Sequence, residues 1–139
     1  MAVVGPGDEP TAAAADVGRL VAERGAVLVC GGLGGAMEAA CRGAKQAEGV
    51  TVGILPGSDR SDANPYVDVA LPTGLGEARN ALVVRAADVV IAIGGGYGTL
   101  SEIALALKAG KRVIGLDTWD IEGVERASDA EAAVAAALT

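Results

Sequence analysis

Short runs of apolar, often β-branched residues alternate along this chain with longer segments whose apolar positions recur every three or four residues. Such runs are typical of buried strands, and such spacing is typical of helices packed on a sheet. The sequence predicts strands at Ala2–Val4, Ala26–Cys30, Val50–Leu55, Val67–Leu71, Asp88–Ile93 and Arg112–Leu116. It predicts helices at Thr11–Arg24, Gly35–Glu48, Gly76–Ala87, Thr99–Ala109 and Ser128–Leu138, with Ser128 as the N-cap of the last.

Alternation of strands and helices with short connections predicts an α/β protein. We expect a single-domain, Rossmann-like three-layer fold, with a parallel sheet and helices on both faces. No repeat, linker or change in composition interrupts the chain, so residues 1–139 are expected to form one nucleotide-binding domain. Right-handed crossovers would bring the carboxyl ends of the strands to one edge of the sheet, where ligands of such sheets bind.

Composition narrows the classes of partner. Apolar residues make up 51% of the chain and aromatic residues only 2%, so the core must consist of Val, Ile, Leu and Ala. The net charge of −7 argues against a nucleic acid partner, which requires a basic surface. The N-terminus lacks the pattern of a signal peptide, and no apolar run is long enough for a membrane span. We therefore expect a cytoplasmic protein without a membrane partner.

The inventory of reactive residues excludes several kinds of chemistry. The chain has no histidine, which removes Ser-His-Asp and Cys-His catalysis and imidazole metal ligands. Its two cysteines, Cys30 and Cys41, stand eleven positions apart and are interpreted as small buried apolar residues. No metal site is expected.

The strongest local motif is the glycine-rich segment Gly94–Thr99, between an apolar strand and an amphipathic helix. Glycines let a ligand approach the backbone, and the free N–H groups at a helix start attract phosphate. The alternative is a tight turn without a ligand. The segment matches neither a Walker motif nor the dinucleotide fingerprint. The expected ligand-binding residues of this loop are Gly95, Gly96, Tyr97, Gly98 and Thr99. Tyr97 is expected to point out of the loop, in a position to stack on a ligand.

Two further glycine-rich segments follow predicted strands and should converge on the same crevice. They contribute Gly5 and Gly7 from one segment, and Gly32 and Gly34 from the other. Met37 lies on the apolar face of the next helix, where it belongs either to the core or to the ligand pocket.

Arg79 and Glu102 are the charged candidates. Arg79 falls inside the apolar stripe of its predicted helix, formed by Leu75, Leu82, Val83 and Ala86. A guanidinium that faces the core needs an anionic partner: a ligand phosphate, a ribose hydroxyl or Glu102, unless Arg79 snorkels or forms a structural ion pair. Glu102 is either the third residue of a capping box that begins at Thr99 or a functional carboxylate at the crevice.

The segment Gly94–Glu102 (GGGYGTLSE) resembles the PGGxGTxxE motif of the Lonely Guy (LOG) family, once labelled lysine decarboxylases. GEARN at 76–80, GGLGGAMEAACRGA at 31–44 and VGILPG at 52–57 are also similar to that family. Two positions differ, because the motif proline is Gly94 here and the lysine after the arginine is Asn80. These differences bring the chain closer to a short LOG-like branch that includes molybdenum cofactor carrier proteins.

The resemblance implies two alternative functions. LOG enzymes are phosphoribohydrolases that cleave the N-glycosidic bond of cytokinin riboside 5′-monophosphates, with Arg79 and Glu102 in the catalytic positions and no cofactor. The carrier branch implies non-catalytic binding of molybdenum cofactor or sensing of a nucleotide, with Asn80 near the ligand. A pyridoxal phosphate decarboxylase is not expected, since Lys45, Lys108 and Lys111 lie away from the crevice. The family also implies a homodimer or a higher homo-oligomer.

Overall fold

The computed structural model describes all 139 residues and forms one seven-stranded sheet in which every neighbouring pair is parallel. The strand order is β4-β3-β2-β1-β5-β6-β7. The strands are β1 (Ala2–Val4), β2 (Leu28–Cys30), β3 (Thr51–Leu55), β4 (Val69–Pro72), β5 (Val89–Ile93), β6 (Arg112–Leu116) and β7 (Val124–Arg126). The chain runs outward from β1 to β4, then returns to β5 beside β1, so the strand order reverses between β1 and β5.

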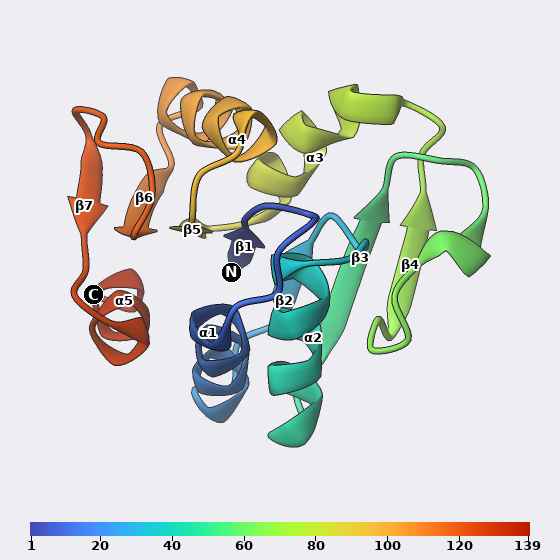
Figure 1. Ribbon diagram of the computed structural model, residues 1–139, viewed down its shortest axis with the longest axis horizontal. Helices are drawn as coiled ribbons and strands as arrows, with labels where there is room; N and C mark the ends of the chain where they lie inside the picture. The colour runs from blue at the N-terminus through green and yellow to red at the C-terminus, as the bar shows by residue number, and fades with distance from the viewer.

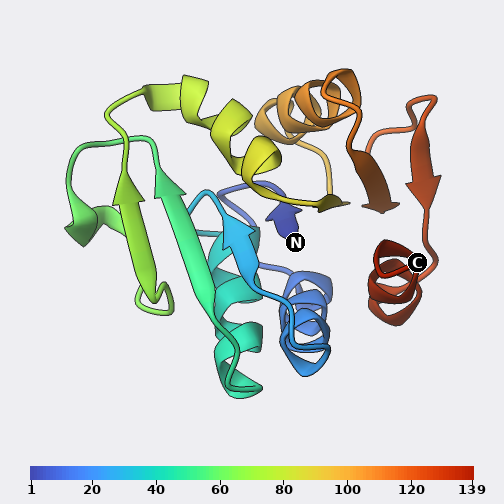
Figure 2. The same cartoon turned by 180° about the vertical axis from the view of Figure 1, so that it is seen from behind.

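Helices cover both faces of this sheet (Figures 1 and 2). On one face lie α1 (Ala12–Glu23), α2 (Ala36–Gln46) and α5 (Ala130–Ala137), and on the other lie α3 (Arg79–Ala86) and α4 (Tyr97–Lys108). Two 3-10 helices, η1 (Arg60–Asp62) and η2 (Gly76–Ala78), complete the chain. The expected Rossmann-like three-layer α/β fold is therefore confirmed.

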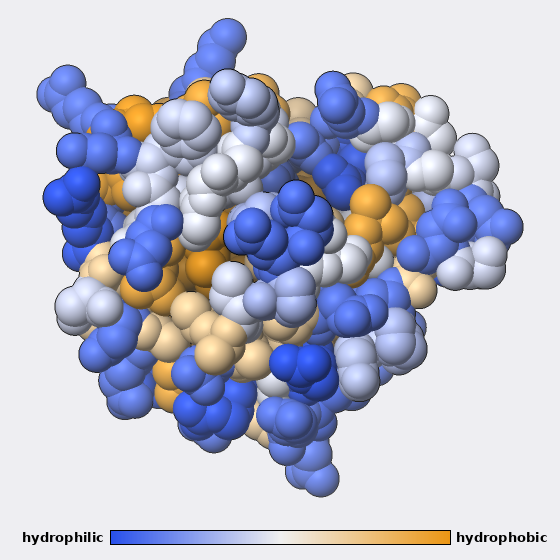
Figure 3. All heavy atoms as spheres, viewed as in Figure 1, coloured by the Kyte–Doolittle hydropathy of each residue, from blue (hydrophilic) through white to orange (hydrophobic).

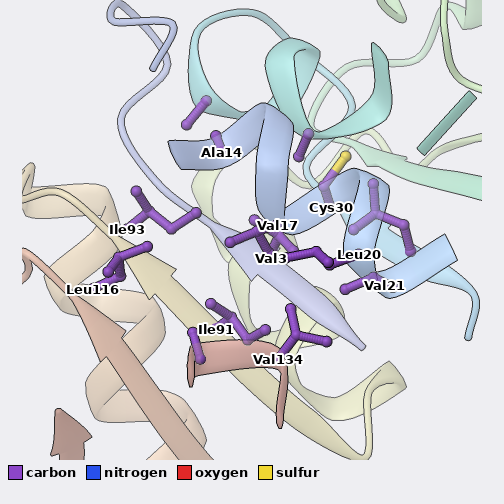
Figure 4. Close-up of a cluster of buried hydrophobic side chains, with 14 of the residues drawn as sticks. Val3, Ala14, Val17, Leu20, Val21, Cys30, Ile91, Ile93, Leu116 and Val134 are labelled. Atoms are coloured by element: carbon purple, nitrogen blue, oxygen red, sulfur yellow. The ribbon is translucent and has the colours of Figure 1, made fainter. Parts of the chain in front are cut away.

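The core consists of two apolar clusters, one on each side of the sheet. The larger one joins side chains of the central strands to α1, α2 and α5, and Figure 4 shows part of it around Val3, Val17 and Ile91. All five residues of β5 are buried, as a central strand covered on both faces requires. Cys30 and Cys41 are both buried and free, as their interpretation as apolar residues predicts.

Small residues allow α1 and α2 to pack closely. Gly18 of α1 lies against the backbone of Ala40, and Gly43 of α2 lies against the backbone of Ala15. A Cβ atom at either glycine would overlap the carbonyl oxygen opposite. The glycines in these helices, which cost helix propensity, thus have a packing role.

We expect Gly43→Ala to destabilise the protein by about 2 kcal/mol, because the added methyl would push α1 and α2 apart. Chemical denaturation would measure the change in the free energy of unfolding. Gly98→Ala is a suitable control, since nothing lies within 4 Å of a Cβ at that helical glycine. Equal stability of the Gly43→Ala variant and the wild type would contradict the packing role.

Two sequence-based interpretations of helix ends are wrong, and one strand was not predicted. Helix α4 begins at Tyr97 with Gly96 as its N-cap, so Thr99 lies inside the first turn and does not form a capping box with Glu102. Asp129, and not Ser128, caps α5 by accepting a hydrogen bond from the Ala132 N–H. Strand β7 was not predicted, because it is a short edge strand with mostly exposed residues and therefore lacks an apolar run.

The apolar stripe expected for α3 is also placed differently. Leu82 is exposed and so are Leu75 and Ala86, whereas Val83 and Val84 enter the core. The helix is rotated because its first residues, Arg79 and Asn80, are themselves buried toward the sheet. Arg79 is thus buried as expected, although most of the residues that were expected to flank it are exposed.

Hydrophilic side chains cover most of the face seen in Figure 3, and apolar residues lie between them. None of the helices combines the length and the apolar character that a membrane span would require.

Candidate functional site

A cavity of about 220 Å³ lies where the strand order reverses, at the carboxyl ends of β1, β2 and β5. Open α/β sheets bind ligands in this position, because neighbouring loops diverge there and leave a crevice. The cavity is lined by Val3, Val4, Gly5, Pro6, Gly7, Asp8, Gly31, Met37, Arg79, Asn80, Gly96, Gly98, Thr99 and Glu102.

Most of the residues singled out from the sequence meet at this cavity. They are Gly5, Gly7, Met37, Arg79, Asn80, Gly96, Gly98, Thr99 and Glu102. Four others do not line it: Gly32, Gly34, Gly95 and Tyr97. Met37 lines the cavity while it packs against the core, so its two interpretations are compatible.

The glycine loop after β5 turns sharply and leaves backbone donors free. Gly94 has a φ of +69°, which favours glycine, and its Cα faces the ring of Pro6. The chain then enters α4, where Leu100 is the first residue to donate its N–H back to the loop, at Gly96. The N–H groups of Gly98 and Thr99 have no acceptor in the protein. They stand at the positive end of the helix dipole and are suited to an anion.

Thr99 provides a second indication of a ligand. Its side chain is only 2% exposed, and its hydroxyl Oγ1 makes no hydrogen bond. A buried hydroxyl without a partner costs free energy, so such groups in proteins usually have a partner. Thr99 lines the cavity in the first turn of α4, so its unpartnered hydroxyl lies at the wall of this site.

Arg79 is buried, with 8% of its surface exposed, and has no acidic partner. Its Nε donates to the carbonyl oxygen of Ile54 at 2.9 Å, Nη1 donates to Asn80 Oδ1, and Nη2 donates to the carbonyl oxygen of Gly31 at 3.4 Å. It takes part in none of the ion pairs of the structure, so Glu102 is not its ion-pair partner.

These contacts use three of the five N–H donors of the guanidinium. A buried cation without a counter-ion is energetically costly. The two remaining donors and the positive charge suit this side of the cavity to an anionic group.

Glu102 is an acidic residue that lines the same cavity as Arg79. It is 7% exposed, and its carboxyl group makes no hydrogen bond. Burial raises the pKa of Glu102 to about 7, although the positive charge of Arg79 lowers it in part. The carboxyl group therefore holds its proton to a higher pH than an ordinary glutamate, which reduces its repulsion of an anionic ligand and suits it to proton transfer.

The sequence analysis missed several residues of the site. Pro6, Asp8 and Gly31 line the cavity. Pro6 and Gly31 stand inside the two glycine-rich segments that were singled out, and Asp8 follows the first of them, but none of the three was named as a site residue. Gly31 is needed because a Cβ there would collide with Arg79 Nη2 and Met37 Sδ. Trp119 was also missed: its indole N–H donates to the carbonyl oxygen of Gly96 at 3.1 Å and holds the glycine loop from outside. It follows β6, far along the sequence from the loop.

Comparison with known proteins gives three kinds of match. The model of the SLOG cluster4 family matches residues 1–138. An uncharacterized protein of Archaeoglobus fulgidus is 52% identical over 100 residues, which are 72% of this chain and 66% of the relative. The chain thus spans just under two thirds of that relative's length.

Two solved structures are similar over almost the whole chain. The molybdenum cofactor binding protein of the phototrophic bacterium Rippkaea orientalis is 44% identical, with a TM-score of 0.91 over 97% of this chain and 92% of that one. The molybdenum cofactor carrier protein of Chlamydomonas reinhardtii is 38% identical, with a TM-score of 0.87 over 97% of this chain and 93% of that one.

Proposed function

We propose, from the premise that this chain belongs to the SLOG cluster4 family, that it binds a phosphorylated pterin of the molybdenum cofactor class and carries it without cleavage. The observation that carries the proposal is that the buried guanidinium of Arg79, which forms no ion pair, lines the same cavity as Gly98 and Thr99 with their free N–H groups. The similarity to molybdenum cofactor binding and carrier proteins supports this choice of ligand.

The residues present fit the phosphate end of such a ligand. The hydroxyl of Thr99 lacks a partner, the N–H groups of Gly98 and Thr99 are free, and Arg79 supplies positive charge. Glycines at positions 5, 7 and 31 keep the walls free of side chains where a ligand must approach the backbone. We infer that these groups bind the phosphate. The metal of the cofactor is part of the carried ligand and needs no metal ligands from this chain.

Isothermal titration calorimetry with purified molybdenum cofactor tests the proposal directly. We expect saturable binding at a stoichiometry of one per chain and recovery of the cofactor intact after release. Competition by ribose 5-phosphate would place the phosphate in the same cavity. The proposal is wrong if the protein binds neither compound.

Thr99→Val is expected to weaken binding of the phosphorylated ligand about fivefold, the equivalent of ~1 kcal/mol for one hydrogen bond. Valine has a similar shape but lacks the hydroxyl, and the free protein should lose no stability because that hydroxyl has no partner. Thr118→Val is a matched control: its hydroxyl is also buried and unpartnered, but it lies outside the cavity. Equal losses of affinity in both variants would contradict the role of Thr99.

One observation favours a second candidate, a nucleoside 5′-monophosphate phosphoribohydrolase. A carboxyl group with a pKa of about 7 beside the ligand cavity is suited to general acid–base chemistry, and a carboxylate can also stabilise an oxocarbenium-like ribose. Incubation with AMP or isopentenyladenosine monophosphate would release free base, and Glu102→Gln would abolish the release while phosphate binding persists. No release by the wild type, with binding retained, would favour the carrier.

A further inference from the structure

A groove of about 680 Å³ adjoins the candidate phosphate cavity, between α3 and α4. Figures 1 and 2 show these two helices side by side on one face of the sheet. Arg79, Asn80 and Gly98 line both hollows, so the groove continues the cavity. The cavity alone, at about 220 Å³, is smaller than the roughly 300–1,000 Å³ that small-molecule sites commonly offer. A ligand whose phosphate enters the cavity must place its remaining atoms elsewhere.

Two of the three aromatic residues of the chain meet at the mouth of this groove. Tyr97 lines the groove and is 84% exposed, the most exposed of the large hydrophobic side chains. Its ring stacks on that of Trp119, with ring centroids 6.1 Å apart and planes at 27°. Trp119 lines a different hollow, after β6, and does not line the groove. One side of the Tyr97 ring is thus supported by Trp119, whereas the ring itself stays open to the groove.

Hydrogen bonds hold the residues on both sides of the Tyr97–Trp119 stack. The indole N–H of Trp119 bonds to the Gly96 carbonyl oxygen, the N-cap of α4, and Tyr97 is the first residue of that helix. On the groove side, Asn80 Nδ2 donates to Ser101 Oγ at 3.2 Å, and that hydroxyl donates to the Gly98 carbonyl oxygen at 2.8 Å. The Asn80–Ser101 bond joins α3 to α4, and the Trp119 bond keeps the aromatic pair beside the glycine loop.

The remaining surface of the groove suits a flat apolar ring. Ala78, Ala81 and Leu105 supply apolar contacts, and Leu105 is exposed. Glu77 supplies an exposed polar group, and the buried Asn80 lies where the groove meets the cavity. An aromatic side chain that stacks on a heterocycle contacts its flat face and therefore accepts different heterocycles. Polar groups nearby bond to the atoms at the edge of the ring and distinguish one heterocycle from another.

We propose that Tyr97 is the stacking surface for the flat nitrogen heterocycle of the bound ligand, a pterin or purine, and that Trp119 is the residue that positions it. This inference rests on the proposed function, because it requires the phosphate of the same ligand to occupy the cavity beside Arg79. It assigns the ring to the α3–α4 groove and the phosphate to the glycine loop.

The test compares two commercially available probes in calorimetric titrations of the full chain. GMP has a phosphate and a bicyclic ring, whereas ribose 5-phosphate has the phosphate and no ring. We expect wild-type protein to bind GMP more tightly than ribose 5-phosphate. Tyr97→Ala should weaken GMP binding about tenfold, as loss of one aromatic stack does elsewhere, and leave ribose 5-phosphate binding unchanged. Tyr97→Phe, which keeps the ring, should retain the preference for GMP.

The role of Trp119 is tested through the ratio of the two affinities, which cancels any general effect on the phosphate loop. Trp119→Phe keeps a ring but loses the N–H donor to Gly96, and it should lower the preference for GMP about threefold. In a Tyr97→Ala background the same substitution should leave the ratio unchanged, because the positioned ring is gone. A purely structural role of Trp119 would instead change both affinities equally in either background.

Different results would overturn the stacking inference and the proposed function. Tight binding of both probes with no effect of Tyr97→Ala on the ratio would overturn the stacking inference and leave the phosphate site intact. Binding of neither probe nor of purified molybdenum cofactor would overturn the proposed function, and the stacking inference with it.

Discussion

Arg79→Met is expected to weaken binding of a phosphorylated ligand about a hundredfold. The guanidinium is buried, forms no ion pair and retains free N–H donors at the cavity. A phosphate bound there would receive two charge-assisted hydrogen bonds, each worth about 1.5 kcal/mol, and a hundredfold loss corresponds to ~3 kcal/mol. Calorimetry with ribose 5-phosphate, which binds through its phosphate, measures the effect.

The free protein should tolerate this substitution. Methionine removes a buried unpaired charge, which is favourable, and also removes the donors to the Ile54 and Gly31 carbonyl oxygens, which is unfavourable. Arg85→Met is the matched control, since Arg85 lies in the last turn of the same helix and is exposed. If both variants bind as the wild type does, Arg79 is a structural residue and the phosphate lies elsewhere.

Glu102→Gln is expected to stabilise the ligand-free protein above neutral pH. The pKa of Glu102 is about 7 in the folded protein and near 4.5 in the unfolded chain. The folded state therefore binds more protons between these values, so the free energy of unfolding falls as the pH rises through them. The full loss is about 3 kcal/mol, from 1.36 kcal/mol per pKa unit, and glutamine removes it.

Urea denaturation of both proteins between pH 5 and pH 8 measures this difference. The stability of the wild type should decline relative to Glu102→Gln as the pH rises, and the two curves should approach each other at the acidic end. Glu122→Gln, at an exposed carboxyl group outside the cavity, should run parallel to the wild type. Parallel curves for Glu102→Gln as well would mean that Glu102 is solvated and that its proposed proton chemistry lacks a basis.

The two candidate functions make different demands on this same carboxyl group. A hydrolase needs Glu102 to exchange a proton or to stabilise positive charge, so turnover would depend on it. A carrier needs only that Glu102 does not repel the phosphate, and glutamine satisfies this demand. Binding that persists in Glu102→Gln at high pH, without turnover by the wild type, would therefore agree with a carrier.

Much of the fold could be predicted from local sequence patterns, because most of the strands and helices have a clear apolar period. The fully apolar run at Val89–Ile93 could only be a central strand, and the glycines after it marked the loop. Once the strands are parallel, the loops at their carboxyl ends must lie together, which placed Gly5, Gly7 and Gly96 at one cavity. Errors arose where the pattern is weak, as at β7, or where a cap depends on backbone geometry, as at Gly96.

The sequence by itself thus determined the parallel α/β architecture and the position of the glycine-rich loop for which phosphate binding is proposed, since apolar periodicity and glycine content are local properties. Only the tertiary structure decided which groups are left unpaired. Arg79 donates hydrogen bonds to backbone carbonyl groups and forms no ion pair with a carboxylate, and Thr99 Oγ1 has no hydrogen-bond partner. Burial raises the pKa of Glu102. Trp119 reaches Gly96 across 23 positions of sequence. Hydrogen bonding, desolvation and stacking depend on distances between distant segments, and those distances exist only in the folded chain.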